Sequence, residues 1–354
     1  GTNNTTISAA WFDRYYTSNY TARRMTANFN LEWEIVDGLR AVMQVANHNY
    51  YRIDNQRLAG NAISNQRRTY EKWGQTNRFS TQGYLNYRKT FAQDHTIEGT
   101  VGFDYMKNTV NGLSLTVTGA DSDKVPTLAA GTDATGWADT NTNEALSSYF
   151  GRLNYDYRKK YLFMFTFRAD GSSKFPSDNR WGYFPSVSAG WIVTNEKWVK
   201  PLLKVLDYAK VRASWGQVGN QNIGDLMFIS PISTSGAYYN FGTALGADGQ
   251  SNYYGAYESR LSNENVKWET SEQLDFGLDL RLLGKLNVNI DWYKKTTKDW
   301  LLVKPIPGTA GTGAPYFNGG DVENTGIEIG LGWNDNIGRD FNYYVNVNGA
   351  YNKN

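Results

Sequence analysis

Cysteine is missing from this sequence of 354 residues, and histidine occurs only twice, as His48 and His95. Without cysteine there can be no disulfide framework, no thiolate metal site and no cysteine nucleophile. Two isolated histidines give no arrangement that suggests a catalytic triad or an imidazole-rich metal site. The composition therefore disfavours metalloenzymes and cysteine hydrolases, and no metal or cofactor is expected.

A surplus of charge and long apolar runs are lacking as well. The 36 Lys and Arg residues nearly balance 34 Asp and Glu residues, whereas a nucleic-acid-binding protein normally carries a basic surplus. The mean hydropathy is −0.58, and bulky apolar stretches such as Tyr161 to Phe165 fall far short of the roughly 20 residues of a transmembrane helix. The first residues also lack the charged and apolar leader of a signal peptide. No nucleic-acid partner, transmembrane helix or signal peptide is predicted.

Alternation with a period of two is the strongest positive signal in the sequence. From Arg24 to Ile35 every odd position is apolar and every even position is polar. A strand places such residues on two opposite faces, whereas a helix would scatter them around its circumference. The same alternation recurs over 149–157, 161–170, 272–282 and 341–351. The protein is therefore predicted to be all-β.

Noisier alternation adds further strands. These runs lie near 39–53, 70–89, 95–109, 182–194, 207–217, 285–300 and 322–333. The total is about twelve strands, many of them near the roughly 9–11 residues that cross a bilayer at a tilt. Strands of a soluble sandwich are nearer 5–6 residues. Strand length therefore favours an antiparallel transmembrane β-barrel, or a soluble barrel of unusual height.

The links between the predicted strands alternate between short and long. Short links follow Ile35, Tyr87, Tyr157 and Leu282, and the long links lie near 54–69, 110–147, 171–181, 218–271 and 301–321. Outer-membrane barrels have short periplasmic turns and longer extracellular loops. The link near 195–206 is longer than its place in this series predicts. We expect it to form a brief helical turn that contains Trp198, Leu202, Leu203 and Leu206.

The direction of successive strands places both ends of the chain outside the cell. The first clear strand runs down to the short turn at Val36, and the last strand runs up from Phe341. Both termini of a complete outer-membrane barrel normally lie in the periplasm. Residues 1–354 are therefore predicted to be an internal part of one larger barrel domain.

The alternation also assigns residues to two faces. The face expected to contact lipid contains Phe29, Trp33, Phe163, Phe165, Phe276 and Leu278. The face expected to line the lumen or contact a plug contains Arg152, Asn154, Asp156, Arg168, Asp170, Asp275, Asp279 and Arg281. Tyr155, Tyr157 and Tyr161 bracket one short turn, as amphipathic rings do at a membrane–water boundary. The alternative for these rings is the packed core of a soluble β protein.

Two short segments are candidate contact sites at the extracellular rim. They are Asp170-Gly171-Ser172 and Asn220-Gln221. Gly171 suits a turn with positive φ, and Asp170 and Ser172 can hydrogen-bond to the turn backbone. The functional interpretation is contact with substrate or with a lid protein. The structural alternative is a simple rim turn, braced in the first segment by Arg180.

The segment 236–257 is rich in Tyr, Gly, Ser and Asn. Its aromatic residues are Tyr238, Tyr239, Phe241, Tyr253, Tyr254 and Tyr257. Such rings supply rigid, amphipathic contact surface at low entropic cost, and long loops of this kind are usually functional or disordered. Tyrosine faces could stack on sugar rings, hold a peptide or order against a lid protein. Packing on neighbouring loops is the alternative.

No motif in the sequence predicts catalysis. Asp121-Ser122-Asp123 begins like a calcium loop but lacks the glycine and the distant glutamate. The glycine-rich segment 308–313 lacks the following helix that a phosphate-binding loop needs. An enzyme is therefore not predicted.

Five segments resemble the SusC/RagA family of TonB-dependent outer-membrane transporters. They are SSYFGRLNYDYRKKYLFMFTFRADGSSKF (147–175), NRWGYFPSVSAGWIVTNEKW (179–198), LDYAKVRASWGQVGNQNIG (206–224), NENVKWETSEQLDFGLDL (263–280) and NGGDVENTGIEIGLGW (318–333). They follow one another in the order that the family uses. Five segments in order are a specific signal, whereas any one alone would be only suggestive.

The resemblance implies a barrel of about 22 strands in the outer membrane of a Gram-negative bacterium, with an internal plug. It further implies import of oligosaccharide or peptide cargo beneath a SusD-like surface lipoprotein, driven by the TonB–ExbB–ExbD system through the plug. A plug domain, a TonB box and the final barrel strand are not recognisable in these residues. A passive porin or adhesin-like barrel without TonB coupling is the alternative. A soluble β hydrolase or lectin is more remote.

Overall fold

The computed structural model describes residues 14–60, 67–234, 236–240 and 252–354. The long strands are β1 (Tyr16–Val36), β2 (Leu39–Leu58), β3 (Arg68–Phe91), β4 (His95–Thr118), β5 (Asp133–Tyr157), β6 (Tyr161–Ser172), β7 (Trp181–Ile192), β8 (Leu206–Asn220), β13 (Glu269–Leu282), β14 (Leu286–Lys298), β17 (Val322–Ile337) and β18 (Phe341–Lys353). The short strands are β9 (Ile232–Ser233), β10 (Tyr238–Asn240), β11 (Asn252–Tyr254), β12 (Tyr257–Glu258), β15 (Leu301–Val303) and β16 (Tyr316–Asn318). The 3-10 helices are η1 (Leu128–Ala130), η2 (Ser177–Asn179), η3 (Val193–Asn195), η4 (Lys197–Lys204) and η5 (Gly308–Ala310). Within the described ranges, no helix has the length and apolar content to cross a membrane.

The twelve long strands form one sheet. Its order is β1-β2-β3-β4-β5-β6-β7-β8-β13-β14-β17-β18, so each long strand is hydrogen-bonded to the next long strand along the chain. β8 pairs antiparallel with β13 across the longest link. The prediction of an all-β protein with about twelve strands is confirmed.

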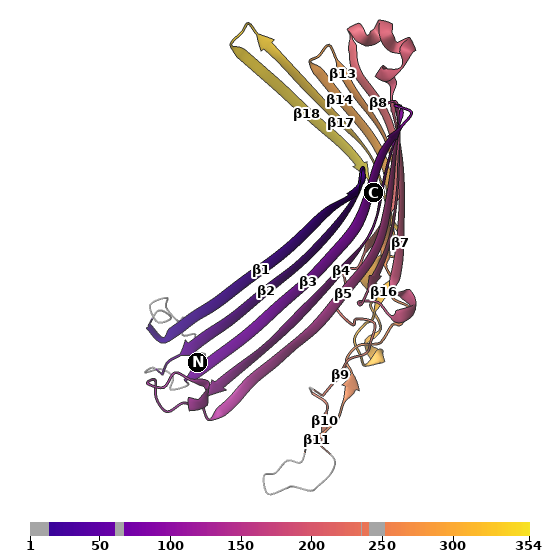
Figure 1. Cartoon of the computed structure of the whole chain (residues 1–354). Helices are drawn as coiled ribbons and strands as arrows, with labels where there is room; N and C mark the ends of the chain where they lie inside the picture. Colours follow the sequence, from indigo (N-terminus) through magenta and orange to yellow (C-terminus); the bar gives the residue numbers. More distant parts are fainter. Residues whose placement is uncertain (1–13, 61–66, 235, 241–251) are drawn as a thin grey trace. The chain divides into compact units, whose positions relative to one another are not determined.

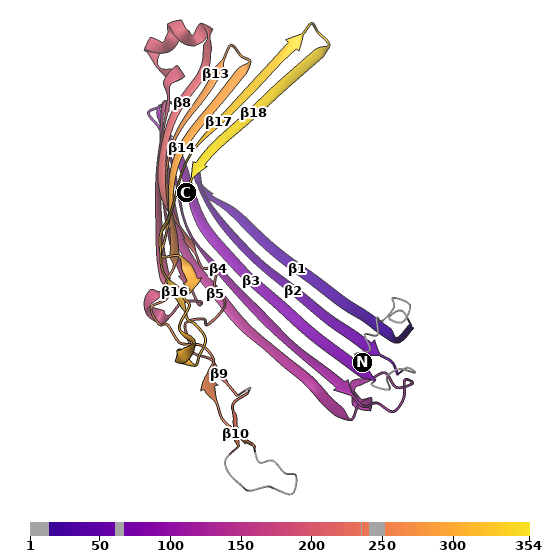
Figure 2. The ribbon, with the colours of Figure 1, turned by 180° about the vertical axis from the view of Figure 1, so that it is seen from behind.

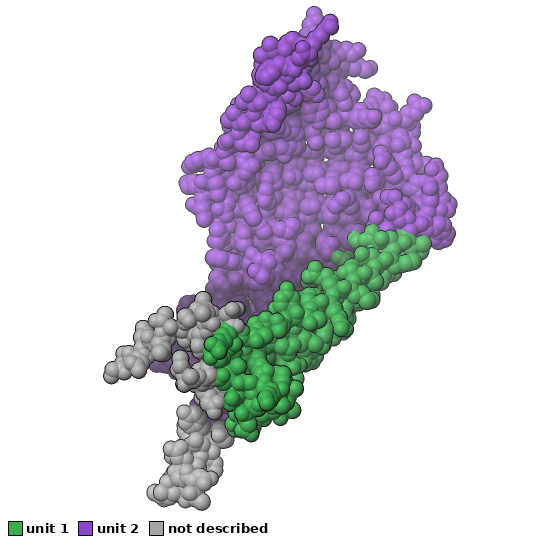
Figure 3. Space-filling view, turned by 90° about the vertical axis from the view of Figure 1, so that its left-hand side faces the viewer, with its two compact units in different colours: residues 1–31, 43–82, 104–145 green, residues 32–42, 83–103, 146–354 purple. Residues whose placement is uncertain are grey.

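The links of the sheet differ in length at its two ends. In Figures 1 and 2 the β13–β14 and β17–β18 turns and η4 lie at one end of the strands, and the short strands β9 and β10 lie at the other. The chain divides into two compact units, coloured green and purple in Figure 3: unit 1 contains residues 1–31, 43–82 and 104–145, and unit 2 contains residues 32–42, 83–103 and 146–354. The residues of the predicted polar face all belong to unit 2.

The short turns use backbone conformations that their residue types do not favour. Arg158 (φ 55°) and Lys159 (φ 53°) are both left-handed, and the Lys160 N–H donates to the Tyr157 carbonyl at 2.9 Å. Two consecutive positive φ values define a type I′ hairpin turn, which usually contains Asn or Gly. Leu283 and Gly284 adopt the same geometry. The pairing of the long strands, rather than the conformational preference of the turn residues, therefore determines the conformation of these turns.

Most of the long strands are longer than the sequence predicts, whereas β7 and β14 end before the predicted runs do. The long strands range from 12 residues in β6 to 25 residues in β5. The predicted loop 110–147 is wrong, because residues up to 118 continue β4 and residues from 133 onward belong to β5. The β5 extension contains the polar run 139–144, which gives no apolar alternation, whereas the β4 extension does alternate at Leu113, Leu115 and Val117 and was wrongly assigned to a loop. The link itself contains only residues 119–132.

The strand register aligns apolar residues into rows on one face of unit 2. One row crosses seven strands through Phe163, Ala189, Ala213, Phe276, Trp292, Ile327 and Tyr351. We call the surface made by this row and its neighbours on the same side of the sheet the apolar face. Phe165 and Phe276 on this face remain 42% and 51% exposed, as expected of side chains that contact lipid.

The adjacent row on the opposite side of the sheet is mostly polar. It contains Met164, Ser188, Ser214, Asp275, Tyr293, Gly326 and Asn352. We call this side of unit 2 the polar face. A one-residue shift of any strand would exchange its two faces, so the register itself maintains the separation.

Matched arginine substitutions on neighbouring residues of β6 test this sidedness. Phe165→Arg is expected to impair barrel assembly strongly, because a cation on the lipid side costs about 2–4 kcal/mol near the bilayer midplane. Thr166→Arg is expected to be tolerated, since Thr166 belongs to the polar face. Heat-modifiable gel mobility measures the assembled fraction of each variant. Equal losses for the two variants would remove the assignment of the faces.

Candidate functional site

The polar face of unit 2 contains an open hollow of about 430 Å3. Its polar lining comes from six strands, and includes Arg88, Glu98, Asn154, Asp156, Ser188, Arg212 and Asp275. Asn154, Asp156 and Asp275 were predicted to share one face, and the hollow brings them together. Arg152 lies on the same side of β5, where its register partner is Thr166.

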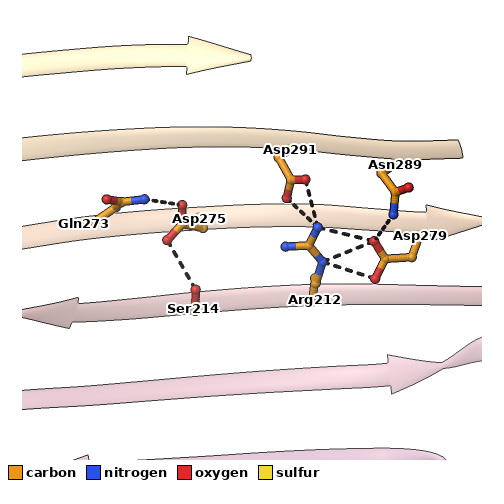
Figure 4. Close-up of polar contacts among 7 residues, drawn as sticks. All are labelled: Arg212, Ser214, Gln273, Asp275, Asp279, Asn289 and Asp291. Carbon is orange, nitrogen blue, oxygen red and sulfur yellow. Dashed lines mark hydrogen bonds and ion pairs between the residues drawn. The ribbon is translucent and has the colours of Figure 1, made fainter. Parts of the chain in front are cut away.

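Arg212 on β8 links carboxylates from two other strands (Figure 4). Its guanidinium Nε lies 3.2 Å from Asp279 Oδ2, and its Nη2 lies 2.6 Å from Asp291 Oδ1. Asn289 Nδ2 donates to Asp279 Oδ1 at 2.9 Å. The predicted residue Asp279 is therefore part of a charged network that crosses β8, β13 and β14.

Gly277 makes this network possible. It lies between Arg212 and Asp291 in the register, on the intervening strand β13. A Cβ atom at Gly277 would lie 2.4 Å from Arg212 Cζ. The arginine therefore reaches the second neighbouring strand only because the residue that it crosses has no side chain.

Asp275 lies in a second, smaller set of polar contacts on the same face (Figure 4). Gln273 Nε2 donates to Asp275 Oδ1 at 2.7 Å, and Ser214 Oγ donates to Asp275 Oδ2 at 3.3 Å. Unlike Asp279, this carboxylate has no cation among its described contacts. It therefore accepts hydrogen bonds from neutral donors beside the hollow.

The structure corrects the predicted turn at Asp170-Gly171-Ser172. All three residues belong to β6 rather than to a turn, and Gly171 does not have a positive φ. A Cβ atom at Gly171 would lie 2.9 Å from the Trp181 ring, so glycine permits close packing here rather than a bend. Arg168, predicted on the polar face, donates to Asp170 Oδ1 at 2.7 Å.

A buried apolar cluster lies at the end of unit 2 where the long links are. It consists of Phe175, Phe184, Ile223, Val266 and Trp268. The Trp268 indole donates to the Arg180 carbonyl at 2.9 Å, and the Ser172 N–H donates to the same carbonyl at 3.1 Å. The Arg180 carbonyl therefore links Trp268 to Ser172, and the segments after β6 and β8 pack together.

The predicted segment Asn220-Gln221 lies beside this cluster. Asn220 ends β8, and its Nδ2 donates to Glu269 Oε1 at 3.0 Å. The Gln221 carbonyl accepts the Ile223 N–H at 2.7 Å, within a tight turn. These contacts give the segment a structural role, and contact with substrate or a lid stays a prediction.

The tyrosine-rich segment forms small antiparallel pairs beyond the main sheet. Tyr238 lies opposite Tyr254, and Tyr239 lies opposite Tyr253, in the β10–β11 pair. Tyr257 pairs with Ser233 in the β12–β9 pair and is 45% exposed. Phe241 lies outside the described residues. The hairpin arrangement groups the predicted contact residues, whose role in binding is untested.

Aromatic rings lie at the boundary of the apolar face, next to the short turns. The Tyr161 ring centroid lies 6.2 Å from that of Tyr157 and 6.5 Å from that of Trp191. Glu196 accepts hydrogen bonds from the Tyr161 hydroxyl at 2.8 Å and from Lys160 Nζ at 2.9 Å. The bond from Lys160, followed by that from Tyr161, holds the pKa of the Glu196 carboxyl below its usual value. An ionised acceptor thus fixes the rings at this boundary.

Glu272 marks the opposite limit of the apolar face. It shares that face with Leu274 and Phe276 but accepts hydrogen bonds from Trp215 Nε1 at 3.2 Å and from Lys298 Nζ at 2.7 Å. From Leu274 to Leu282 the face is apolar at every second residue. This span of nine residues on β13 matches the roughly 9–11 residues of a tilted membrane strand.

Sequence reasoning missed the residues that the register pairs across distant segments. Arg212, Asp291 and Glu272 lie in runs predicted to be strands, but no local signal joins Arg212 to a residue 79 positions away. The one available signal was alternation, since Arg212 stands between the apolar residues Val211 and Ala213. That pattern predicts on which face of the sheet Arg212 lies but does not predict which residue it contacts.

Two glycine substitutions test the role of Gly277. Gly277→Ala is expected to destabilise the protein by about 1–2 kcal/mol, because the new methyl group displaces a charge-assisted network. Gly99→Ala is the control, since an added Cβ there meets nothing within 4 Å. Thermal unfolding in detergent compares the two variants with the wild type. A Gly277→Ala variant as stable as Gly99→Ala would show that the crossing of Arg212 is unimportant.

Comparisons with known proteins agree with this geometry. The family model described as "TonB dependent receptor-like, beta-barrel" matches residues 1–354. SusC of Bacteroides thetaiotaomicron, a TonB-dependent receptor, is 38% identical over 218 residues, which are 60% of this chain and 21% of SusC. TonB-dependent receptor P39 of Formosa agariphila is 33% identical over 286 residues, or 78% of this chain and 26% of that protein. The chain thus spans about a fifth to a quarter of the length of these two relatives.

A solved structure of the RagAB peptide importer in its closed-closed state has the same fold. It superimposes with a TM-score of 0.86 at 22% identity, and the match covers 97% of this chain and 37% of the other. Together with the two-faced sheet, these similarities identify an outer-membrane β-barrel. The family consists of receptors and transporters rather than enzymes. The chain belongs to the TonB-dependent receptor-like β-barrel family, in its SusC/RagA branch.

Proposed function

We propose that the chain forms part of the wall of an importer that moves oligomeric nutrients across the outer membrane. The observation that carries this proposal is the polar face, with Arg212, Asp279 and Asp291 hydrogen-bonded across three strands opposite an apolar face. Charged groups cannot face hydrocarbon without a large cost. The polar face must therefore meet water, a plug or cargo, which makes it the lumen side of the barrel.

The importer is proposed to depend on TonB. Its SusC/RagA membership supports coupling to the TonB–ExbB–ExbD system through a plug. The proposed cargo is a glycan fragment or a peptide. The sequence identity to the RagAB peptide importer is only 22%, so this similarity does not favour one class of cargo over the other. Carboxylate and amide groups on the polar face, such as those of Asp275 and Asn154, can hydrogen-bond to either class of cargo.

A SusD-like surface lipoprotein is the proposed lid. The long links between β8 and β13 and between β14 and β17 lie at the end of unit 2 opposite the short turns (Figure 1). Val266 of the β8–β13 link packs in one cluster with Phe175 of the β6–β7 link, and both side chains are fully buried, which gives the rim an ordered base. The exposed Tyr257 and its tyrosine-rich neighbours extend from that base. A lid that opens needs a partly polar interface, and Tyr, Asn and Ser supply one.

Dissipating the proton-motive force separates this proposal from a passive porin. Uptake of labelled cargo by cells that carry the full-length protein is expected to stop when a protonophore is added, because TonB draws on that force. Diffusion of a small solute through an unrelated porin in the same cells is the control. Cargo uptake that continues at its original rate would favour the porin.

Shortening the tyrosine-rich segment tests its proposed role at the lid. Replacing 236–257 by a short Gly/Ser linker is expected to leave the barrel assembled, since this segment lies outside the main sheet. Recovery of the lipoprotein in a pull-down, or the rate of cargo import, is expected to fall several-fold. Heat-modifiable mobility controls for assembly. Full lipoprotein recovery together with wild-type import would leave the segment without a role in binding.

A further inference from the structure

The link between β7 and β8 displays a compact patch of apolar side chains. Within η4, Trp198 is 62% exposed, Leu202 is 57% exposed and Leu203 is 40% exposed, and Val205 directly after it is 52% exposed. Single exposed apolar residues are ordinary on protein surfaces. Four of them within the eight residues from 198 to 205 form a contiguous patch, and such patches mark contact with a partner or a membrane.

The patch is held by an ordered backbone. Val199, in the first part of η4, is only 1% exposed, so its buried side chain holds η4 against the rest of the protein. The Leu283 N–H donates to the Val205 carbonyl at 2.8 Å, which ties the end of the link to the β13–β14 turn. Thr194 Oγ1 accepts the Ala209 N–H at 3.4 Å. The chain therefore presents these apolar groups at a fixed place instead of folding them inward.

Three exposed lysines accompany the apolar patch. They are Lys197, Lys200 and Lys204, and η4 contains no acidic residue. In the part of the chain that the structure describes, no ion pair neutralises any of the three. The nearest carboxylates in sequence are Glu196, which is bonded to Lys160 and Tyr161, and Asp207, which accepts the Gly284 N–H. The link therefore combines apolar surface with uncompensated positive charge.

The patch continues the aromatic boundary of the apolar face. The Trp198 ring centroid lies 6.4 Å from that of Trp191, which in turn lies 6.5 Å from that of Tyr161. Tyr161 begins β6, whose next odd residues, Phe163 and Phe165, belong to the apolar face. The surface that meets lipid therefore extends without a break from the strands onto η4, at the end of the short turns.

We propose that residues 197–205 form an interfacial anchor that lies on the periplasmic phospholipid surface of the outer membrane. Trp198, Leu202 and Leu203 enter the boundary between headgroups and acyl chains, and the lysines bind the phosphates of anionic phospholipids. A basic, amphipathic segment with Trp and Leu on its apolar side has this binding mode. Short turns lie on the periplasmic side of such barrels, which selects that leaflet. The anchor would hold the wall at a fixed depth whatever cargo the protein carries.

Depth-dependent quenching tests insertion of the anchor. The full-length protein carries either Leu203→Cys or, as a control, Asp340→Cys in the exposed β17–β18 turn, and each is labelled with an environment-sensitive fluorophore. In nanodiscs with nitroxide-labelled phospholipids, the label at 203 is expected to show blue-shifted emission and at least about twofold stronger quenching than the label at 340. Aqueous emission at both positions would overturn the proposal. A shielded label at 203 that lipid nitroxides do not quench would also overturn it, because a protein would then cover the patch.

Loss of the lysines tests headgroup binding. The variant K197Q/K200Q/K204Q is compared with K124Q/K267Q/K304Q, which removes the same charge from the long links. Native mass spectrometry measures the ratio of retained phosphatidylglycerol to retained phosphatidylethanolamine. A basic residue near an anionic surface contributes roughly a fivefold preference, so the first variant is expected to lower the ratio at least fivefold and the control to leave it unchanged. Equal ratios in both variants would refute the assignment of the lysines to lipid phosphates.

Discussion

The strand register is the constraint on which the other features of this structure depend. In a bilayer every backbone N–H and C=O group must find a partner within the protein, so neighbouring strands pair continuously. Pairing with a period of two then assigns each side chain to one of two environments. Phe163, Phe276 and Trp292 fall in one row because their backbones are paired, and that row lies on the face that we assign to lipid. Asp275 and Ser214 fall in the next row, on the opposite face.

The same register explains why particular small residues occur within the strands. Arg212 reaches Asp291 only across Gly277, since any side chain at that place would occupy the position of the guanidinium. Gly171 serves a similar purpose beside the Trp181 ring. Both glycines lie in regular strands, so their use is close packing rather than an unusual backbone angle. The polar face thus gains a network of charge pairs whose partners come from separate strands.

The limits of the apolar face are set by ionised groups that bind aromatic side chains. Glu196 accepts from Tyr161 at the short-turn end, and Glu272 accepts from Trp215 at the other end. Between Glu272 and the short turn that follows Leu282, β13 presents about the apolar length of a membrane crossing. Beyond Glu272, β13 continues through three polar residues, and the polar run 139–144 likewise lies within β5. The structure therefore separates the length of a strand from the length that crosses the membrane.

Much of this architecture could be predicted from the sequence, because alternation is a local property. The faces of Phe165 and Asp275 and the positions of the twelve strands follow from it, and the helical turn near Trp198 follows from the spacing of apolar residues. Contacts between distant segments could not be predicted, as the pair of Arg212 and Asp291 shows. The polar run 139–144 in β5 gave no apolar signal, the alternation of Leu113, Leu115 and Val117 in β4 was missed, and Gly171 was misassigned because glycine serves both turns and close packing. The role of Tyr238 and its neighbours in binding stays a prediction.

The central claim is that the two faces of the sheet meet lipid and water, respectively. Spin labels placed singly along β13 from 271 to 282 in the full-length protein, in bilayers, test it most directly through their collisions with oxygen and with a water-soluble nickel chelate. The account predicts a period of two, with oxygen accessibility highest at the even positions from 274 to 282, nickel accessibility highest at the odd positions, and loss of the oxygen signal at 272. Accessibility without this period, or with odd and even positions exchanged, would contradict the account.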